Sequence, residues 1–508
     1  MSRLESQSEE REALAGEDPD GGEEPRSMYG DAGVAPPSDQ PLPSSRAEPP
    51  RPLPPEAREL GGKLAGLTLP RQVFVLAVWP FFELVLNALV GIVDTVIAGH
   101  LDNVAAANAI AVAAFVGWLL NMLNGALGVG SSAVVARAMG ARNKRLVNAA
   151  VGQAVLLAFA WGAVSGLGLF LLAEPIAVFC GLTGEAQHMA TRYVQIVAVI
   201  GPLSAMLFTG NAVLRAAGDT RTPFIAMTLV NVVNIGLSLT LVYAPAPWGG
   251  FGVAGIAGGT AGAWCLGGVG VLVVLISSKG PVKLWVHRLR PQWNVARRIV
   301  RVGIPALIES SGMWIGNAII LRIVGGLGHA AGPGAHIVAV RVESISFMPA
   351  FAIGTASAVL TGQYLGLGDP ARARRAIRLS WGFAGVMMAG FGVLFMLAPE
   401  PLARLLSKHP EVYELAGEVI FICGPAQFFF GTYLVLSQAF RGAGDTKTTM
   451  ILTYASTFGI RLPAAWILGE IMGLGLTGVW FALCGELVIR GCLYMARYVH
   501  GGWAKVEV

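Results

Sequence analysis

The segment Leu214-Arg-Ala-Ala-Gly-Asp-Thr-Arg-Thr222 returns 226 residues later as Phe440-Arg-Gly-Ala-Gly-Asp-Thr-Lys-Thr448. The same displacement relates Glu83 to Glu309, two acids that stand inside apolar stretches rather than in loops. A fixed register across both loops and apolar stretches is typical of a chain that contains two copies of one unit. The sequence therefore predicts two homologous halves.

Composition places these halves in a membrane. The 508 residues are 54% hydrophobic and only 13% charged, and the mean hydropathy is +0.61. A soluble protein would carry about 25% charged residues. The lipid bilayer is therefore an expected partner. We expect no nucleic-acid partner, because the basic residues gather in loops between apolar runs.

The apolar runs predict an all-α fold of transmembrane helices. Each run is long enough to cross about 30 Å of hydrocarbon. Twelve helices in two pseudo-symmetric six-helix bundles are expected, with ten spans and two re-entrant pairs as the alternative. The predicted spans are 71–98, 105–132, 147–173, 190–214, 222–244, 253–277, 299–325, 334–360, 376–399, 413–438, 448–469 and 474–497.

Charge in the loops predicts the orientation. Lys and Arg gather in the loops after the even-numbered spans and are scarce in the others. The positive-inside rule then places both termini in the cytoplasm, and we expect a multi-pass protein of the plasma membrane. Because each half has six spans, both halves insert the same way, and such parallel repeats handle substrate at their interface.

The chain outside the bundles has its own composition. Residues 1–65 contain 14 Asp/Glu against 7 Lys/Arg and 11 of the 29 prolines, which predicts a disordered acidic tail. The five cysteines are dispersed and predict neither disulfides nor a metal cluster. The predicted organisation is an acidic tail at 1–65, a first bundle at 66–278, a basic linker at 279–298, a second bundle at 299–498 and a C-terminus at 499–508.

Three motifs carry a resemblance to a known family. Residues 91–101, GIVDTVIAGHL, resemble a signature of multidrug and toxic compound extrusion (MATE) transporters, and the paired R-x-A-G-D-T loops and the 139–145 loop are similar to that family too. The resemblance covers about residues 68–498. It implies two six-helix bundles around a central cleft. It also implies export of amphipathic small molecules, cations above all, in exchange for protons or Na⁺, by a protein that we expect to be monomeric.

The resemblance assigns an ion-coupling group in the first half. The family's acid of the first span falls on Asp94, and its cation-site asparagine and threonine resemble Asn234 and Thr260. A second acid of many members is Ser238 here. Glu83 lies 11 residues before Asp94, close to three helical turns, so both acids share one helix face. Acids at membrane depth are functional candidates. A Na⁺ ion at Asp94, Asn234 and Thr260 is one possibility, protonation of the acids is the other, and no further cofactor is expected.

The second half offers candidates for substrate binding. Glu309 is the repeat mate of Glu83. Glu343 either serves the substrate or pairs with Arg461, because a buried arginine favours a bidentate carboxylate. Thioether and aromatic side chains are suited to flat cationic drugs. The substrate-binding candidates are Glu309, Glu343, Met313, Met348 and Phe428.

Two other functions remain as alternatives. A flippase for lipid-linked sugars or polymers would need a basic cleft, for which Arg322, Arg341 and Arg461 are the residues to follow. An intramembrane aspartyl protease is suggested by the GxGD at 442–445, although the flanking basic residues favour helix capping by Asp219 and Asp445. No Walker A motif is present, so we expect transport driven by an ion gradient and no enzyme activity.

Overall fold

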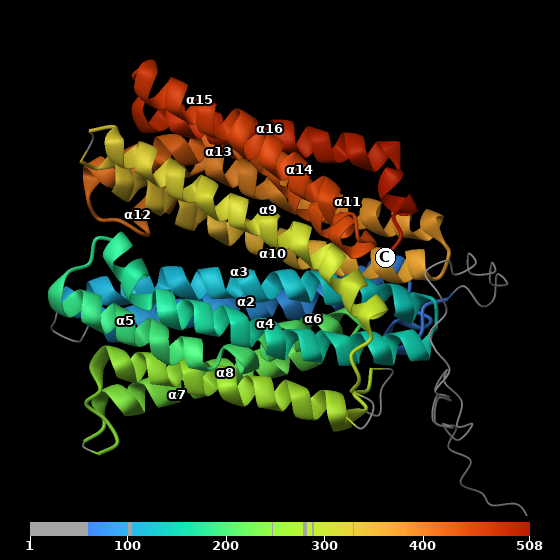
Figure 1. The fold of residues 1–508 in the computed structure, drawn as a ribbon. Helices are drawn as coiled ribbons and strands as arrows, with labels where there is room; N and C mark the ends of the chain where they lie inside the picture. Colours follow the sequence, from blue (N-terminus) through green and yellow to red (C-terminus); the bar gives the residue numbers. More distant parts are fainter. Residues whose placement is uncertain (1–58, 100–103, 246, 278–281, 287–288, 329) are drawn as a thin grey trace, which may run out of the picture. The chain divides into compact units, whose positions relative to one another are not determined.

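The computed structural model describes residues 59–99, 104–245, 247–277, 282–286, 289–328 and 330–508, and within them every regular element is helical. Figure 1 shows the helices of the first half as one group and those of the second half as another. The first half comprises α2 (Leu69–Gly99), α3 (Val104–Gly140), α4 (Lys144–Phe179), α5 (Gly184–Val199), α6 (Gly201–Ala216), α7 (Arg221–Tyr243) and α8 (Gly252–Ser277).

The second half repeats this order with one irregular span. Its long helices are α9 (Trp293–Gly326), α10 (Gly332–Gly366), α11 (Pro370–Leu397), α13 (Pro410–Ala443) and α16 (Gly475–His500), and a short α12 (Pro399–Arg404) precedes α13. The span before α16 consists of α14 (Thr446–Ser456) and α15 (Leu462–Trp466), with π-helical segments at Thr457–Arg461 and Ile467–Ile471.

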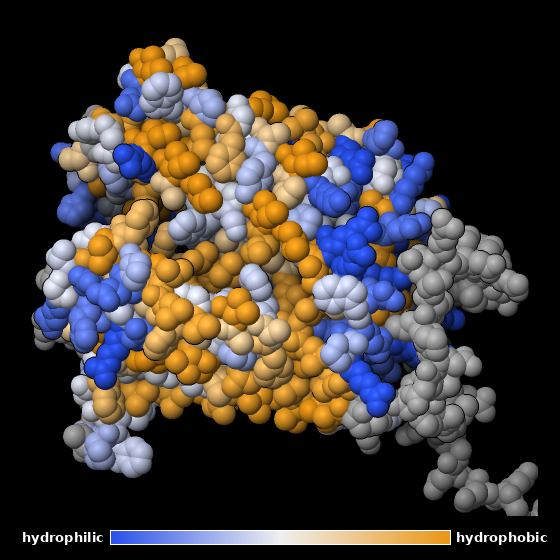
Figure 2. All heavy atoms as spheres, in the orientation of Figure 1, coloured by the Kyte–Doolittle hydropathy of each residue, from blue (hydrophilic) through white to orange (hydrophobic). Residues whose placement is uncertain are grey.

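The predicted twelve-span fold is confirmed. Within the described ranges, eleven helices are long and apolar enough to cross a membrane, and the pair α5–α6, bent by 61°, brings the number to twelve when it is taken as one bent span. The bend has a local cause. Pro202, at the start of α6, has no N–H for the helix ladder, and Gly201 lies directly against the backbone of Gly162. Figure 2 shows apolar side chains over the middle of the molecule and hydrophilic ones toward the end near the C-terminus.

The two halves meet through reciprocal backbone contacts. Gly140, which ends α3, packs on the carbonyl of Gln363 in α10, and Gly366, which ends α10, packs on the carbonyl of Arg137 in α3. Gly366 stands 226 positions after Gly140, and Gln363 stands 226 positions after Arg137, so the repeat exchanges the two contacts. A Cβ at either glycine would collide with backbone, so only glycine allows this approach. Equivalent glycines thus make equivalent contacts with the opposite half, as expected for two halves that are related by a pseudo-twofold axis.

Chain ends reinforce this contact at one end of the molecule, which we call the basic end (residues 137–145, 215–221, 363–378 and 441–447). Leu60 and Leu64 are buried, so the predicted tail does not extend to residue 65: its last residues pack on the bundle, and residues 1–58 lie outside the described part. Trp503 is also buried beyond the second bundle. Arg137 donates to the carbonyls of Ala443 at 3.2 Å and Val506 at 2.7 Å.

Arg137→Ala should loosen the basic end. The substitution removes two hydrogen bonds from a charged donor to the other half, each worth about 1.5–3 kcal/mol. A cysteine at Ala443, buried in the wild type, should then react about tenfold faster with a small maleimide. Arg378→Ala, at an exposed arginine of the same end, is the control. Equal labelling rates in all three proteins would contradict this role.

Candidate functional site

A cavity of about 380 Å³ lies between the two halves. Side chains from α2, α3 and α6 line it on one side, and side chains from α9, α10 and α13 line it on the other. Its wall is apolar over much of its area and includes Phe208 and Phe351. Its polar residues include Glu83, Asn87, Asn121, Arg215, Gln438 and Arg441.

One ion pair in each half borders this cavity. Arg215 Nη1 lies 3.1 Å from both carboxylate oxygens of Glu83, and Arg441 Nη2 lies 3.0 Å from Glu309 Oε1. Both partners of the second pair stand 226 residues after those of the first. The repeat therefore preserves an ion pair and not only an acid.

The surroundings of the two acids differ. Glu309 is 0% exposed and accepts hydrogen bonds from Thr449 at 2.9 Å and Thr453 at 3.0 Å. Tyr494 in turn contacts the Thr453 hydroxyl at 3.1 Å. The Glu83 side chain is 13% exposed and lines the cavity. The carboxylate of Glu309 is thus enclosed, whereas that of Glu83 is accessible.

The structure brings together part of the predicted ion-coupling group. Asn234 Nδ2 donates to Thr260 Oγ1 at 3.0 Å, which joins α7 to α8. The Asn234 Oδ1 and the Ser238 hydroxyl, one turn later on α7, are buried and find no hydrogen-bond partner among the described residues. The side chain of Asp94 lies outside the described residues, although its backbone belongs to α2. Glu83 is held separately by Arg215.

These oxygens fit a hard cation. Na⁺ prefers oxygen ligands, and an unpartnered buried oxygen is costly unless something occupies it. Asn234 Oδ1, Thr260 Oγ1 and Ser238 Oγ supply three uncharged oxygens in one region. In the sequence, Ser238 was noted only as the residue that replaces an acid of many family members. The unpartnered hydroxyl of Ser238 is a ligand candidate that the sequence did not indicate.

A second buried charge cluster lies within the second half. Glu486 in α16 contacts Arg490 at 2.6 Å and Arg461 at 2.7 Å, and the side chains of Glu486 and Arg490 are 0% exposed. Arg490 also donates to Ser456 and Thr457, at 3.0 and 2.7 Å. The π-helical segment that begins at Thr457 carries two of these partners.

This cluster corrects one sequence-based alternative. Arg461 pairs with Glu486 and not with Glu343, so the proposed Glu343–Arg461 pair is wrong. Glu343 instead accepts a long contact of 3.6 Å from the Cys423 thiol. Sequence reasoning missed Glu486 and Arg490, although their i,i+4 spacing with opposite charge was a usable signal.

The remaining substrate-binding candidates do not line the cavity. Met313 Sδ accepts from Arg490 at 3.4 Å. Met348 is partly buried in α10. Phe428, 38% exposed, packs edge-on to Trp381 with ring centroids 6.0 Å apart. None of these three, nor Glu309 or Glu343, is among the described side chains that line the cavity.

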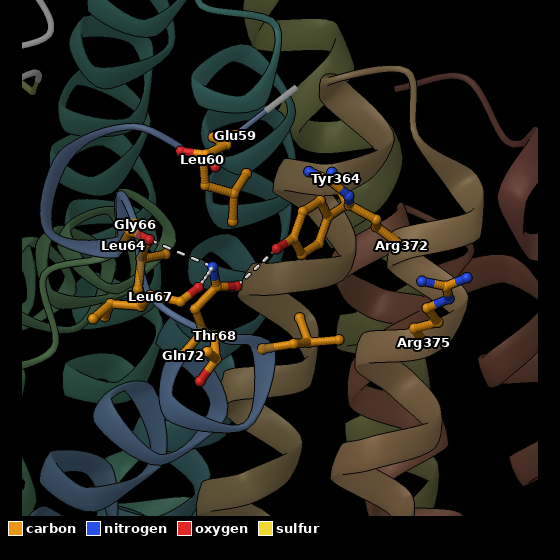
Figure 3. A pocket seen from close by; sticks show the side chains of 11 residues that line it. Glu59, Leu60, Leu64, Gly66, Leu67, Thr68, Gln72, Tyr364, Arg372 and Arg375 are labelled. Atoms are coloured by element: carbon orange, nitrogen blue, oxygen red, sulfur yellow. Dashed lines mark hydrogen bonds between the residues drawn. The ribbon is translucent and has the colours of Figure 1, made fainter. Parts of the chain in front are cut away.

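Figure 3 shows a second hollow, of about 300 Å³, at the basic end. Gln72 of the first half accepts a hydrogen bond of 2.8 Å from Tyr364 of the second half. Its amide nitrogen donates to the carbonyl of Leu67 at 2.9 Å. These bonds add to the glycine contacts that join the halves at this end.

The two GDT loops have structural roles, but only Asp219 caps a helix as predicted: the side chain of Asp445 accepts no hydrogen bond from a described backbone N–H of α14. Asp219 accepts from the Thr222 backbone N–H at 3.2 Å and pairs with Lys63 at 2.9 Å. Burial raises the pKa of Asp219, but hydrogen bonds from Thr222 and Lys63 outweigh it, and the net pKa is below its ordinary value. Asp445 accepts from the Thr448 hydroxyl at 2.6 Å and pairs with Arg497 at 2.7 Å.

Comparison with known proteins identifies the family. The MatE family model matches residues 81–240 and 305–467. The chain is 30% identical to the "Probable multidrug resistance protein NorM" of Thermotoga maritima, over 86% of this chain and 94% of that protein. It is 28% identical to "Multidrug resistance protein PmpM" of Pseudomonas aeruginosa, over 78% and 86%. A solved structure of a MOP superfamily transporter from Pyrococcus furiosus has the same fold, with a TM-score of 0.80, 20% identity and coverage of 86% and 97%. The chain belongs to the MATE family of multidrug efflux transporters and is a multi-pass membrane protein, not an enzyme.

Proposed function

We propose that this protein is a secondary active antiporter that exports amphipathic small molecules in exchange for protons or Na⁺. The observation that carries the proposal is the cavity between two repeat-related halves, with reciprocal glycine contacts holding the halves together at the basic end. A site at the interface of parallel repeats suits alternating access, in which the halves rock about a fixed site. The names of the relatives, multidrug resistance proteins, support a broad range of small-molecule substrates.

The proposed coupling step uses the first half. Asp94, Asn234 and Thr260 would bind the ion, with Ser238 as a further oxygen and Glu83 as a second acid at the cavity. An ion shifts the equilibrium between two conformations only as far as it binds one of them better. Ion binding would therefore favour the conformation that releases substrate outside.

The proposed orientation places the basic end in the cytoplasm. Its Lys and Arg residues obey the positive-inside rule if both termini are cytoplasmic and the protein lies in the plasma membrane. In this orientation the joined basic end separates the cavity from the cytoplasm. We expect the monomer to suffice for transport, since both halves of the site come from one chain.

The three arginines that were considered for a flippase do not support this alternative. Arg322 and Arg341 are exposed on α9 and α10, and Arg461 is buried against Glu486. None of the three is among the described residues that line the cavity.

The proposal is tested in proteoliposomes loaded with fluorescent amphiphiles, ethidium among them. A Na⁺ gradient and a pH gradient are imposed separately. One of them should drive export against a concentration difference, and it identifies the coupling ion. If neither gradient moves any amphiphile faster than protein-free liposomes do, the proposed function is wrong.

A further inference from the structure

Among the described side chains, more positive than negative groups face the cavity. In both ion pairs the arginine is the more exposed partner: Arg215 is 21% exposed against 13% for Glu83, and Arg441 is 19% exposed against 0% for Glu309. Glu309 lies behind Arg441 and does not line the cavity. Among the described residues, the charged side chains that line it are therefore two guanidinium groups and one carboxylate.

Arg441 retains donors for a ligand. A guanidinium has five N–H donors in a planar fork. Arg441 uses Nη2 on Glu309 at 3.0 Å, and its Nη1 reaches Gln438 only at 3.4 Å. Its Nε has no hydrogen-bond partner among the described residues but is buried, so an acidic ligand would meet the guanidinium at its Nη groups. A guanidinium matches the oxygens of a carboxylate or sulfonate.

Arg215 offers the same chemistry from the opposite half. It places one nitrogen, Nη1, on both oxygens of Glu83. As the repeat mate of Arg441, it lines the same cavity from α6 as Arg441 does from α13. An acidic group between the halves would thus meet a guanidinium on either side, and the apolar part of the ligand would meet Phe208 and Phe351.

Resting on the proposed export function, we propose that the cavity selects amphiphiles that carry an acidic group, as zwitterions or anions, and that Arg441 and Arg215 bind that group. Among the described side chains, a cation without an acidic group would face two guanidinium groups and one accessible carboxylate. In a zwitterion the positive part can face Glu83 while the acid faces Arg441. This refines the broader expectation of cationic substrates.

A matched dye pair tests the preference. Rhodamine 110 has a free carboxylate beside its cationic chromophore, and rhodamine 123 is its methyl ester. Binding of each dye to the purified protein is measured by fluorescence polarisation, and movement of each is measured in proteoliposomes under the gradient that drives export. Wild-type protein should bind rhodamine 110 about tenfold more tightly than rhodamine 123.

Variants assign the preference to the arginines. Arg441→Gln and Arg215→Gln should each lose most of the preference, because rhodamine 110 then binds more weakly while rhodamine 123 binds at least as tightly as before. Because Arg441→Gln leaves Glu309 unpaired, the double variant Glu309→Gln/Arg441→Gln keeps the charge balanced and should show the same loss. Arg322→Gln, at an exposed arginine outside the cavity, is the control and should keep the preference.

The two readouts separate the two claims. Equal binding of both dyes to the wild type, no binding of rhodamine 110, or a preference that survives in both arginine variants would overturn the proposed selectivity. Selective binding without gradient-driven movement of either dye would support the selectivity and count against the export function.

Discussion

Glu486→Gln should destabilise the protein by about 3–5 kcal/mol, because it leaves two buried arginines without their shared carboxylate. Glu486 contacts Arg490 at 2.6 Å and Arg461 at 2.7 Å, and its side chain is 0% exposed. The hydroxyls of Ser456 and Thr457 hydrogen-bond Arg490 but cannot neutralise it. The melting temperature in detergent, with size-exclusion chromatography to detect aggregation, measures the effect.

Two variants act as controls for this prediction. Glu418→Gln removes an exposed carboxylate from the same half and should leave the melting temperature nearly unchanged. The double variant Glu486→Gln/Arg490→Met removes one buried charge of each sign and should recover part of the loss. A Glu486→Gln protein that melts with the wild type would show that the cluster contributes little to stability.

Asp94→Asn should abolish gradient-driven export while leaving expression near normal. The resemblance places the family's acid here, and Asn234 Oδ1 and Ser238 Oγ on α7 are unpartnered buried oxygens. Asparagine keeps the size of the side chain but can neither bind a proton at working pH nor offer a negative charge to Na⁺. Export driven by the Na⁺ or pH gradient, followed with a fluorescent substrate, measures the effect.

Exchange of labelled for unlabelled substrate, with no ion gradient, is the internal control. It should persist in Asp94→Asn, because substrate binding and the rocking of the halves do not need the missing charge. Wild-type rates of gradient-driven export in this variant would remove Asp94 from the coupling mechanism.

The repeat predicted more of the fold than any local pattern. Apolar runs fixed the number of spans because hydrocarbon thickness sets their length. The 226-residue displacement also predicted that Glu83 and Glu309 occupy equivalent positions. Each forms an ion pair with an arginine of its own half, but Glu309 is enclosed and Glu83 lines the cavity. The displacement could not reveal how closely the halves approach, since a glycine contact such as that of Gly140 becomes visible only when both halves are placed.

The charged partners were harder to predict. The predicted spans ended just before Arg215 and Arg441, because an arginine beside an apolar run resembles the start of a loop. In the structure Arg215 lies in the last turn of α6 and Arg441 near the end of α13, and each reaches the acid of its own half. An arginine side chain is long enough to reach from the end of its helix to an acid within the bundle. A hydropathy profile along the sequence does not show such a contact. Glu486 escaped notice because hydropathy averaging over α16 conceals a compensated pair.

The reverse flux tests antiport most directly. Proteoliposomes are prepared without any ion gradient, and a concentration gradient is imposed for an amphiphile that the protein exports. Internal pH and internal Na⁺ are followed with fluorescent indicators. Antiport predicts that substrate flow drives one ion the opposite way and so builds a gradient of that ion, and that Asp94→Asn abolishes this ion movement. Substrate flow in the wild type with no movement of either ion would contradict coupled export.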